Sequence, residues 1–274
     1  MIEDLSLGWQ TDLIFARFDG LVTQAPDCVV VRSPSNPLYY WGNCLILPEP
    51  PRDADLAHWR RRFIEEIGAL QAKSRHVAIG FDAGQAHAPL TSWSDAGFEL
   101  FSTWALRLTR DALREPKGPL PAGLSFRALE LPTGLEAAVD LQCAIDAGEH
   151  EAVDYREHRK RQMLRYQAMQ EQGLGYWFGL WHGQTLVADC GLFRHGTLGR
   201  FQHVGTHPSW RRRGLCSALI HAVCRHGFER MDLQDLVICA DPEDVAIGLY
   251  ESLGFRRVSQ HWGAQLRPPV AAQA

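Results

Sequence analysis

The chain has 274 residues, of which 46% are apolar and 22% charged, with a formal net charge of −4. This balance is typical of a globular protein with a buried core, and the negative charge excludes bulk attraction to nucleic acid or anionic lipid. No apolar run approaches the roughly 18 residues that cross a bilayer, and the start Met-Ile-Glu-Asp shows no signal peptide.

The N-terminal part of the chain has the alternation of short β-prone and helical segments that is typical of an α/β domain. Strands are expected at residues 28–32, 39–47 and 76–81, helices at 56–70 and 91–96, and a last strand that ends near Leu108. Residues 114–123 (REPKGPLPAG) follow, and their proline and glycine content predicts a linker. The predicted domains are therefore residues 1–113 and 124–274.

The C-terminal part begins with a predicted strand and two helices, and then turns to β-rich sequence. A hairpin is indicated where the aromatic run GYWFGLW meets a His182-Gly183 turn. The expected order is strand 124–128, helices to about 146 and at 154–171, strands 175–181, 185–193 and 201–206, helix 213–230, strand 236–240, helix 246–253 and strand 255–266. This order predicts a mixed sheet with helices packed on it. The phrase Asp95-Ala-Gly-Phe-Glu99 echoes Ser252-Leu-Gly-Phe-Arg256, which indicates an internal duplication.

The most informative stretch is VGTHPSWRRRGLCSAL, residues 204–219, where a strand ends at Thr206 and a turn opens a long helix. The first N–H groups of a helix have no intrahelical acceptor, and with the helix dipole they attract a diphosphate. Gly214 lets an anion approach the backbone closely. The arginines add positive charge, and Ser217 adds a hydroxyl group.

This stretch resembles the acetyl-CoA signature Q/R-x-x-G-x-G/A of the GNAT (Gcn5-related N-acetyltransferase) superfamily, here filled by Arg211-Arg-Arg-Gly214-Leu-Cys216. Cys216 departs from the usual Gly or Ala. The segment AIGLYESLGF, residues 246–255, is close to a second family motif, A-x-x-L-Y-x-x-L-G-F. The resemblance covers about residues 124–266. It implies the acyl-CoA N-acyltransferase fold, a mixed and mostly antiparallel central sheet flanked by helices, here duplicated.

The resemblance also implies a division of roles around acetyl-CoA. In such enzymes the strand before the turn, here 201–206, splays from its neighbour, and backbone groups of Val204 and Thr206 would bind the pantetheine arm. Tyr250 matches the tyrosine that protonates the departing thiolate, whereas Asp241 stands where many members carry Asn, so its contact with the cofactor is in doubt. The predicted cofactor-binding set is Val204, Thr206, Arg211, Arg212, Arg213, Gly214, Leu215, Cys216 and Ser217.

The expected chemistry is direct attack of a neutral amine on the thioester carbonyl, which needs a proton acceptor because an ammonium has no lone pair. His203 and Asp189 are the candidates for this base, with His203 preferred, and Tyr250 is the candidate acid. A backbone N–H near Thr206 or Val204 would stabilise the oxyanion. The acidic residues Asp146, Glu149, Glu151 and Asp154 could draw a cationic amine, although a solvated loop is the simpler interpretation.

Alternatives remain open at several of these residues. The arginine turn could be a solvated charge run or a nucleic-acid patch, Tyr250 and His203 could be packing residues, and Cys216 at a helix start could be a nucleophile. The His203/His207 pair lacks a third ligand, so no metal is expected. The seven cysteines contain no C-x-x-C pair, which argues against disulfides and for a reducing cytoplasm.

The N-terminal part has PEPPRDADL, residues 48–56, where the C-terminal part has its arginine turn. Three prolines remove N–H donors that a phosphate cradle needs, so this copy is predicted to have lost cofactor binding. The leading hypothesis is a cytoplasmic acetyl-CoA-dependent N-acetyltransferase that acts on a small-molecule or peptide amine, with no nucleic acid or membrane partner. The alternative is a non-catalytic acyl-CoA sensor or scaffold. The sequence leaves open the acceptor, the acyl length and the oligomeric state, for which a homodimer is one option.

Overall fold

The computed structural model describes residues 2–82, 88–131, 133–146 and 152–268. The chain forms two compact units, unit 1 from residues 1–105 and 259–274 and unit 2 from residues 106–258. Two long strands, β5 (Glu99–Thr109) and β11 (Arg256–Leu266), contribute to both units. The sequence instead places the division at residues 114–123, and that division into domains stays a prediction.

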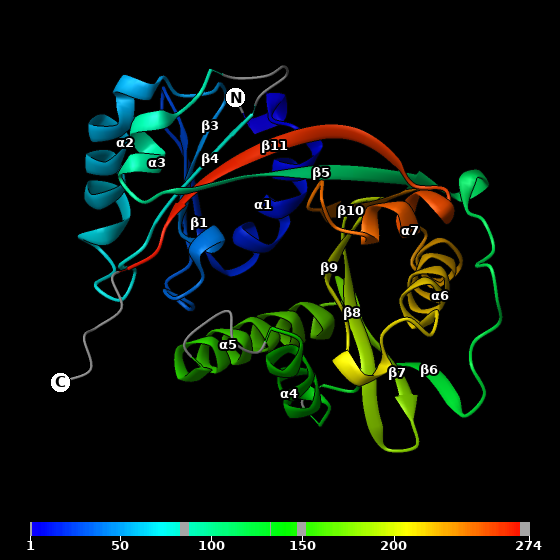
Figure 1. The fold of residues 1–274 in the computed structure, drawn as a ribbon. Coiled ribbons are helices and arrows are strands. Elements are labelled where there is room, and N and C mark those ends of the chain that lie inside the picture. Colours follow the sequence, from blue (N-terminus) through cyan, green and yellow to red (C-terminus); the bar gives the residue numbers. More distant parts are fainter. Residues whose placement is uncertain (1, 83–87, 132, 147–151, 269–274) are drawn as a thin grey trace. The chain divides into compact units, whose positions relative to one another are not determined.

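Unit 1 is a sheet with helices beside it (Figure 1). Its strand order is β1-β2-β3-β4-β11-β5, with β3 parallel to β4 and with β1–β2, β2–β3 and β4–β11 antiparallel. The remaining elements of unit 1 are α1 (Leu7–Asp19), β1 (Leu21–Gln24), β2 (Val29–Arg32), β3 (Cys44–Leu47), α2 (Leu56–Phe63), β4 (Val77–Asp82) and α3 (Thr91–Asp95).

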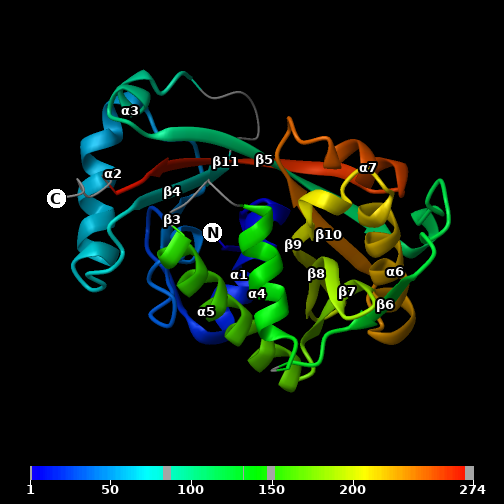
Figure 2. The same ribbon diagram turned by 60° about the horizontal axis from the view of Figure 1, so that its bottom comes forward.

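The core of unit 1 lies around β2, β3 and β4, whose side chains are nearly all buried. Helices α1 and α2 cover these strands from opposite sides (Figures 1 and 2), and strands covered on both faces become apolar throughout. The ring of Trp9 on α1 packs so closely that a Cβ on Gly80 of β4 would lie 2.3 Å from it. Burial of this kind stabilises helix α1.

Two expectations for unit 1 are corrected by the structure. The sequence analysis predicts no element before residue 28, yet α1 and β1 are present. Gly8, Thr11 and several aromatic residues give α1 a weak local helix signal, and its stability comes from packing. Residues 39–47 are not one strand, because Tyr40–Gly42 forms a 3₁₀ turn before β3 begins at Cys44.

Unit 2 has the strand order β5-β10-β9-β8-β7-β6, in which β9–β10 is parallel and β6–β7, β7–β8 and β8–β9 are antiparallel. The remaining elements of unit 2 are β6 (Leu124–Ala128), α4 (Leu135–Ile145), α5 (Ala152–Glu171), β7 (Gly175–His182), β8 (Thr185–His195), β9 (Leu198–Thr206), α6 (Leu215–Arg230), β10 (Asp235–Ala240) and α7 (Ala246–Ser252).

Strand β8 forms the centre of unit 2, and its residues from Leu186 to Phe193 are all buried. Helix α6 lies on one face of the strands and α4 with α5 on the other (Figures 1 and 2). The predicted fold class, a mixed and mostly antiparallel sheet flanked by helices, is confirmed. Within the described part of the chain, no helix has the length and apolar character needed to cross a membrane.

Candidate active site

The candidate site is built on a β-bulge in strand β9. The pairing with β8 matches Asp189 with Gly205 but Gly191 with Gln202, so β9 carries one extra residue opposite Cys190. His203 lies in that bulge with a φ of +44°, in the left-handed region that non-glycine residues seldom adopt. A bulge leaves its extra residue without a residue partner and bends the strand.

Strand β9 also separates from its other neighbour. Its residue partners on β10, among the described residues, run only from Leu198 to Arg200, although β9 continues to Thr206. The N–H of His207 donates to Val187 of β8. Because successive residues of a strand point their N–H groups to opposite edges, the N–H of Thr206 faces the opening on the β10 side. This geometry agrees with a backbone role for Thr206, and the role of Val204 stays a prediction.

The turn after β9 presents backbone donors at the start of α6. Gly214 is the N-cap residue in the left-handed conformation, with φ of +77°, and a Cβ placed on it would meet no atom within 4 Å. The first helical bond runs from Ala218 N–H to Gly214 O, at 3.1 Å. The N–H groups of Leu215, Cys216 and Ser217 therefore have no acceptor within the helix, which suits a diphosphate.

The arginines of the turn divide between structural and open roles. Arg211 donates from Nε to Thr206 O at 3.3 Å and from Nη2 to Ile145 O at 3.5 Å. Arg213 stacks over the Trp210 ring, 4.9 Å from its centroid, and donates to Ser209 O. Arg212 has a positive φ of 61° and an exposed side chain. All of these side chains keep positive charge at the mouth of the site.

Tyr250 and Cys216 lie close together beneath this turn. Tyr250 is only 5% exposed, and burial, with the nearby Cys216, Asp244 and Cys190, raises its pKa well above the ordinary value. Its phenol is thus fully protonated at neutral pH and can act as an acid. Burial raises the pKa of the Cys216 thiol to about 12, which removes the thiolate that a nucleophile needs.

The two candidate bases, His203 and Asp189, border one space. A Cβ on Gly205 would lie 3.5 Å from Asp189 Oδ1 and 3.7 Å from His203 Nε2. Both atoms are buried without a hydrogen-bond partner. Burial raises the pKa of Asp189 to about 7, opposed by hydrogen bonds from Trp177 and Gln142. Burial, together with the nearby Arg159 and His158, lowers the pKa of His203 well below its usual value.

Helix α5 contributes a polar cluster that the sequence analysis missed. Arg159 donates to Tyr155 Oη at 2.6 Å and to Gln162 Oε1 at 3.0 Å, and it pairs with Asp146 at 3.1 Å. Tyr155 also donates to Asp146. In the sequence, Tyr155 and Arg159 at positions i and i+4 of one helix indicate that these two side chains can meet. Asp146 is thus neutralised within the fold, Asp154 is exposed, and Glu149 and Glu151 lie outside the described residues.

Asp241, at the end of β10, serves the local turn. Its Oδ1 accepts the N–H of Glu243 at 2.8 Å, and its carbonyl accepts the N–H of Asp244 at 3.1 Å. This aspartate therefore stabilises the connection into α7, and the structure gives no support to a role in cofactor binding.

Unit 1 lacks the geometry that opens β9. Its parallel strands β3 and β4 remain paired up to Leu47 and Phe81, the last residue of β3 and its partner. Where α6 begins with free donors, α2 is preceded by carboxylates already bonded to the protein. Asp55 accepts from Arg52, and Asp53 accepts from the N–H and hydroxyl of Ser92. An anion would meet negative charge here, which supports the predicted loss of cofactor binding.

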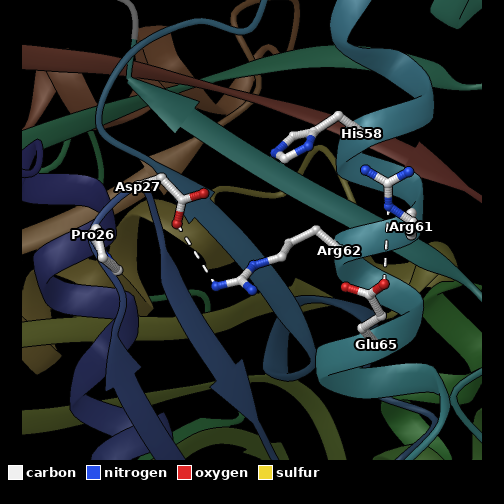
Figure 3. Close-up of a pocket in the computed structure, with 6 residues that line it drawn as sticks. All are labelled: Pro26, Asp27, His58, Arg61, Arg62 and Glu65. Carbon is white, nitrogen blue, oxygen red and sulfur yellow. Dashed lines mark ion pairs between the residues drawn. The ribbon is translucent and has the colours of Figure 1, made fainter.

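A shallow depression of about 350 Å³ lies elsewhere in unit 1, between the β1–β2 turn and helix α2 (Figure 3). Four of its lining side chains form two ion pairs, Arg61 with Glu65 at 3.9 Å and Arg62 with Asp27 at 3.8 Å, and Pro26 and His58 complete the lining. We assign this open, charged surface no part in the site. No cluster able to hold a metal ion occurs within the described ranges.

Comparison with known protein families gives a match over the segment that contains this site. Residues 143–255 match the model of the acetyltransferase (GNAT) family. A GCN5-related N-acetyltransferase from Kribbella flavida superposes with a TM-score of 0.65 at 16% identity, covering 96% of this chain and 94% of that one. A conserved protein of unknown function from Staphylococcus epidermidis gives a TM-score of 0.71 at 14% identity, covering 92% and 95%.

A tandem GNAT protein from the clavulanic acid biosynthesis pathway also resembles the whole chain. The TM-score is 0.55 at 13% identity, over 99% of this chain and 94% of that one. At this identity the likeness shows the fold, which is consistent with a tandem arrangement. No curated protein sequence matches the chain. The family recognition made from the two motifs is confirmed, and the family supports an acyltransferase in general.

Proposed function

Residues 143–255 form a domain of the acetyltransferase (GNAT) family, and from this premise we propose that the protein is an acetyl-CoA-dependent N-acetyltransferase. The observation that carries the proposal is the combination of the opened, bulged end of β9 with the donor-bearing start of α6. The first suits an extended pantetheine arm, and the second suits a diphosphate. Both features lie on consecutive segments of unit 2.

Acetyl-CoA would be held mainly by backbone groups. The N–H groups of Leu215, Cys216 and Ser217, with the charge of Arg212, would bind the pyrophosphate. The open-edge groups of Val204 and Thr206 would bind the pantetheine amides. A backbone N–H at the bulge would stabilise the oxyanion that forms when the amine attacks the thioester carbonyl. The other predicted contacts, Arg211, Arg213 and Gly214, would give the turn its shape and positive charge.

The reaction needs one base and one acid on opposite sides of the thioester. His203 in the bulge would take a proton from the acceptor ammonium. Its lowered pKa keeps the imidazole neutral, with its lone pair present, and also makes it a weak base that has to pass the proton on. Tyr250 would give its phenolic proton to the thiolate of CoA. The raised pKa of this phenol ensures that the proton is present at neutral pH.

The acceptor in this proposal is a primary amine of a small molecule or peptide, with no metal and no nucleic acid involved. All seven cysteines are free thiols, which supports a reducing compartment such as the cytoplasm. A homodimer stays an option that the geometry leaves open.

The test measures release of free CoA from acetyl-CoA in the presence of a panel of amines. Wild-type protein is compared with Tyr250→Phe, which keeps the ring that packs 6.1 Å from Phe255 and removes only the hydroxyl. Tyr176→Phe is the matched control on β7. We expect amine-dependent release in the wild type and the control, and a fall of about 100-fold in kcat for Tyr250→Phe with acetyl-CoA affinity retained.

Two outcomes would contradict the proposal. Tight binding of acetyl-CoA without release by any amine would favour the non-catalytic sensor. No binding of acetyl-CoA at all would show that neither copy keeps a working cofactor site.

A further inference from the structure

Two buried polar atoms of unit 2 face a common space and have no partner. Asp189 Oδ1 and His203 Nε2 both border the side-chain position of Gly205, at 3.5 and 3.7 Å from where its Cβ would be. Ile145 closes this space from α4, because its Cδ1 would lie 2.4 Å from the same Cβ. Glycine at position 205 therefore makes room for the Ile145 side chain beside the two polar atoms.

An unpaired buried acceptor and an unpaired buried ring nitrogen cost free energy unless something joins them. A buried water needs two or more polar partners, and these two atoms supply them. With Nε2–H donating to such a water and the water donating to the carboxylate, the imidazole is held in one tautomer. Nδ1 is then the ring nitrogen with a lone pair for the acceptor amine.

We propose that Asp189 holds the proton removed from the acceptor amine, receiving it from His203 through one water bound beside Gly205. This relay deepens the acetyltransferase function proposed above and rests on it for its substrate. His203 takes a proton from the ammonium at Nδ1 and releases one from Nε2, the water passes a proton on, and the Asp189 carboxylate becomes a carboxylic acid. The neutral amine then attacks the thioester carbonyl, so that the C–N bond forms and the C–S bond breaks. Tyr250 gives its phenolic proton to the CoA thiolate and takes up the extra proton from the new amide nitrogen.

The surrounding charges explain why the proton moves on to Asp189. Arg159 and His158 on α5 face His203, and positive charge there opposes an imidazolium. Asp189 is neighboured by the same Arg159, by Asp146 at the end of α4 and by Cys190 on its own strand. Trp177 Nε1–H donates to Asp189 Oδ2 at 2.8 Å, and Gln142 lies at 3.4 Å. Oδ2 is thereby held in place, and Oδ1 is left for the water.

Protonation of Asp189 can be followed without any turnover, by NMR of protein labelled with ¹⁵N-tryptophan. The indole N–H of Trp177 reports the charge of Asp189, and Trp177→Phe identifies its signal among the nine tryptophans. We expect a titration midpoint near pH 7 that disappears in Asp189→Asn. In His203→Phe, which removes both ring nitrogens, we expect the midpoint to move by about one pH unit. A midpoint below pH 5, or one unchanged in His203→Phe, overturns the relay.

Kinetics supply the second readout. Asp189→Asn keeps one side-chain oxygen, which can accept from both Trp177 and Gln142 as Oδ2 does, so the core is preserved. We expect kcat/KM to fall about 100-fold with loss of the acidic limb of its pH profile. Trp177→Phe removes a donor that stabilises the carboxylate, and we expect this limb to move to higher pH. A merely structural role for Asp189 would lower activity equally at every pH.

The two proposals fail in different ways. An NMR midpoint near 7 that responds to His203→Phe, in a protein that acetylates no amine, keeps the relay and rejects the acetyltransferase function. Full acetyltransferase activity of Asp189→Asn with an unchanged pH profile keeps the function and rejects the relay. Circular dichroism and acetyl-CoA affinity of each variant establish that the fold is retained.

Discussion

Replacement of Gly214 by glutamate places a carboxylate where the diphosphate is expected to bind. The backbone at Gly214 has φ of +77° and its side-chain space is open, so the substitution causes no steric clash. An L residue in this region costs about 1 kcal/mol of stability through backbone strain. Gly173→Glu, at φ of +71° in the equally open turn between α5 and β7, carries the same strain at the opposite end of β7 from the site and is the matched control.

The expected loss of affinity follows from Coulomb's law. A carboxylate about 5 Å from each of two phosphate charges, in the water-like dielectric of an exposed turn, repels them by about 2 kcal/mol in total. This energy corresponds to about a 30-fold rise in the Kd for acetyl-CoA. Salt at 1 M shortens the screening length to about 3 Å, so most of the difference should vanish there.

Calorimetric titration with acetyl-CoA at low and high salt measures this effect, and urea unfolding measures the strain. The strain should be equal in the two variants, and the affinity loss should be confined to Gly214→Glu at low salt. Equal affinity of the two variants, or a loss that persists at 1 M salt, would refute the diphosphate assignment. Acetyl-pantetheine, which lacks the pyrophosphate, should bind both variants equally.

The remaining predictions concern the thiol, the core and the buried carboxylate. Cys216→Ala should keep at least half of the acetyltransferase activity. Iodoacetamide should not inhibit the wild type, because the pKa of the Cys216 thiol is raised to about 12. Loss of activity on alkylation of Cys216 would contradict this prediction. Gly80→Ala should lower the free energy of unfolding by about 2 kcal/mol, because the new Cβ would lie 2.3 Å from Trp9. Gly68→Ala, at a helical position with open space, should raise the free energy of unfolding by about 0.5 kcal/mol. Urea titrations of the two variants measure both effects. The pKa of Asp189 is raised to about 7 in the folded chain from its usual value near 4, so the stability due to its protonation is complete below pH 4 and is lost as pH rises to 7. As the pH rises from 4 to 8, the unfolding free energy of Asp189→Asn should therefore increase relative to that of the wild type by up to about 4 kcal/mol. Unfolding free energies that change with pH by the same amount in the two proteins would rule this out.

The elements predicted best from sequence are those with strong local signals. The long helix after the arginine turn, the GYWFGLW hairpin and the buried strand 236–240 all occur in the structure close to their predicted bounds. The sequence predicts no helix at α1 because its glycine, threonine and aromatic residues have little intrinsic helix preference, and packing against β4 stabilises it. The Tyr40–Gly42 turn was read as strand because its aromatic residues favour both environments.

The residues of the candidate site also differ in how far the sequence predicts them. Short motifs suffice to predict a backbone-based binding site, because a glycine at a helix start and the residues beside it are contiguous in sequence. The roles of His203 and Asp189 depend on a one-residue bulge and on the absence of a side chain at Gly205. Register shifts of this kind leave no pattern in a single sequence. The Tyr155–Arg159–Asp146 cluster joins two helices, and only its i, i+4 pair on α5 can be read from the sequence.

The sequence by itself was enough to predict the fold class and the family resemblance that matches residues 143–255, and to propose a segment for diphosphate binding, because these depend on local composition and spacing. Only the tertiary structure decided which side chains share the space beside Gly205, that β9 separates from β10 after Arg200, and that β3 and β4 in unit 1 do not separate. These properties arise from contacts between segments far apart in the chain, and burial, which shifts the pKa values of Asp189, His203 and Tyr250, exists only once those segments have packed.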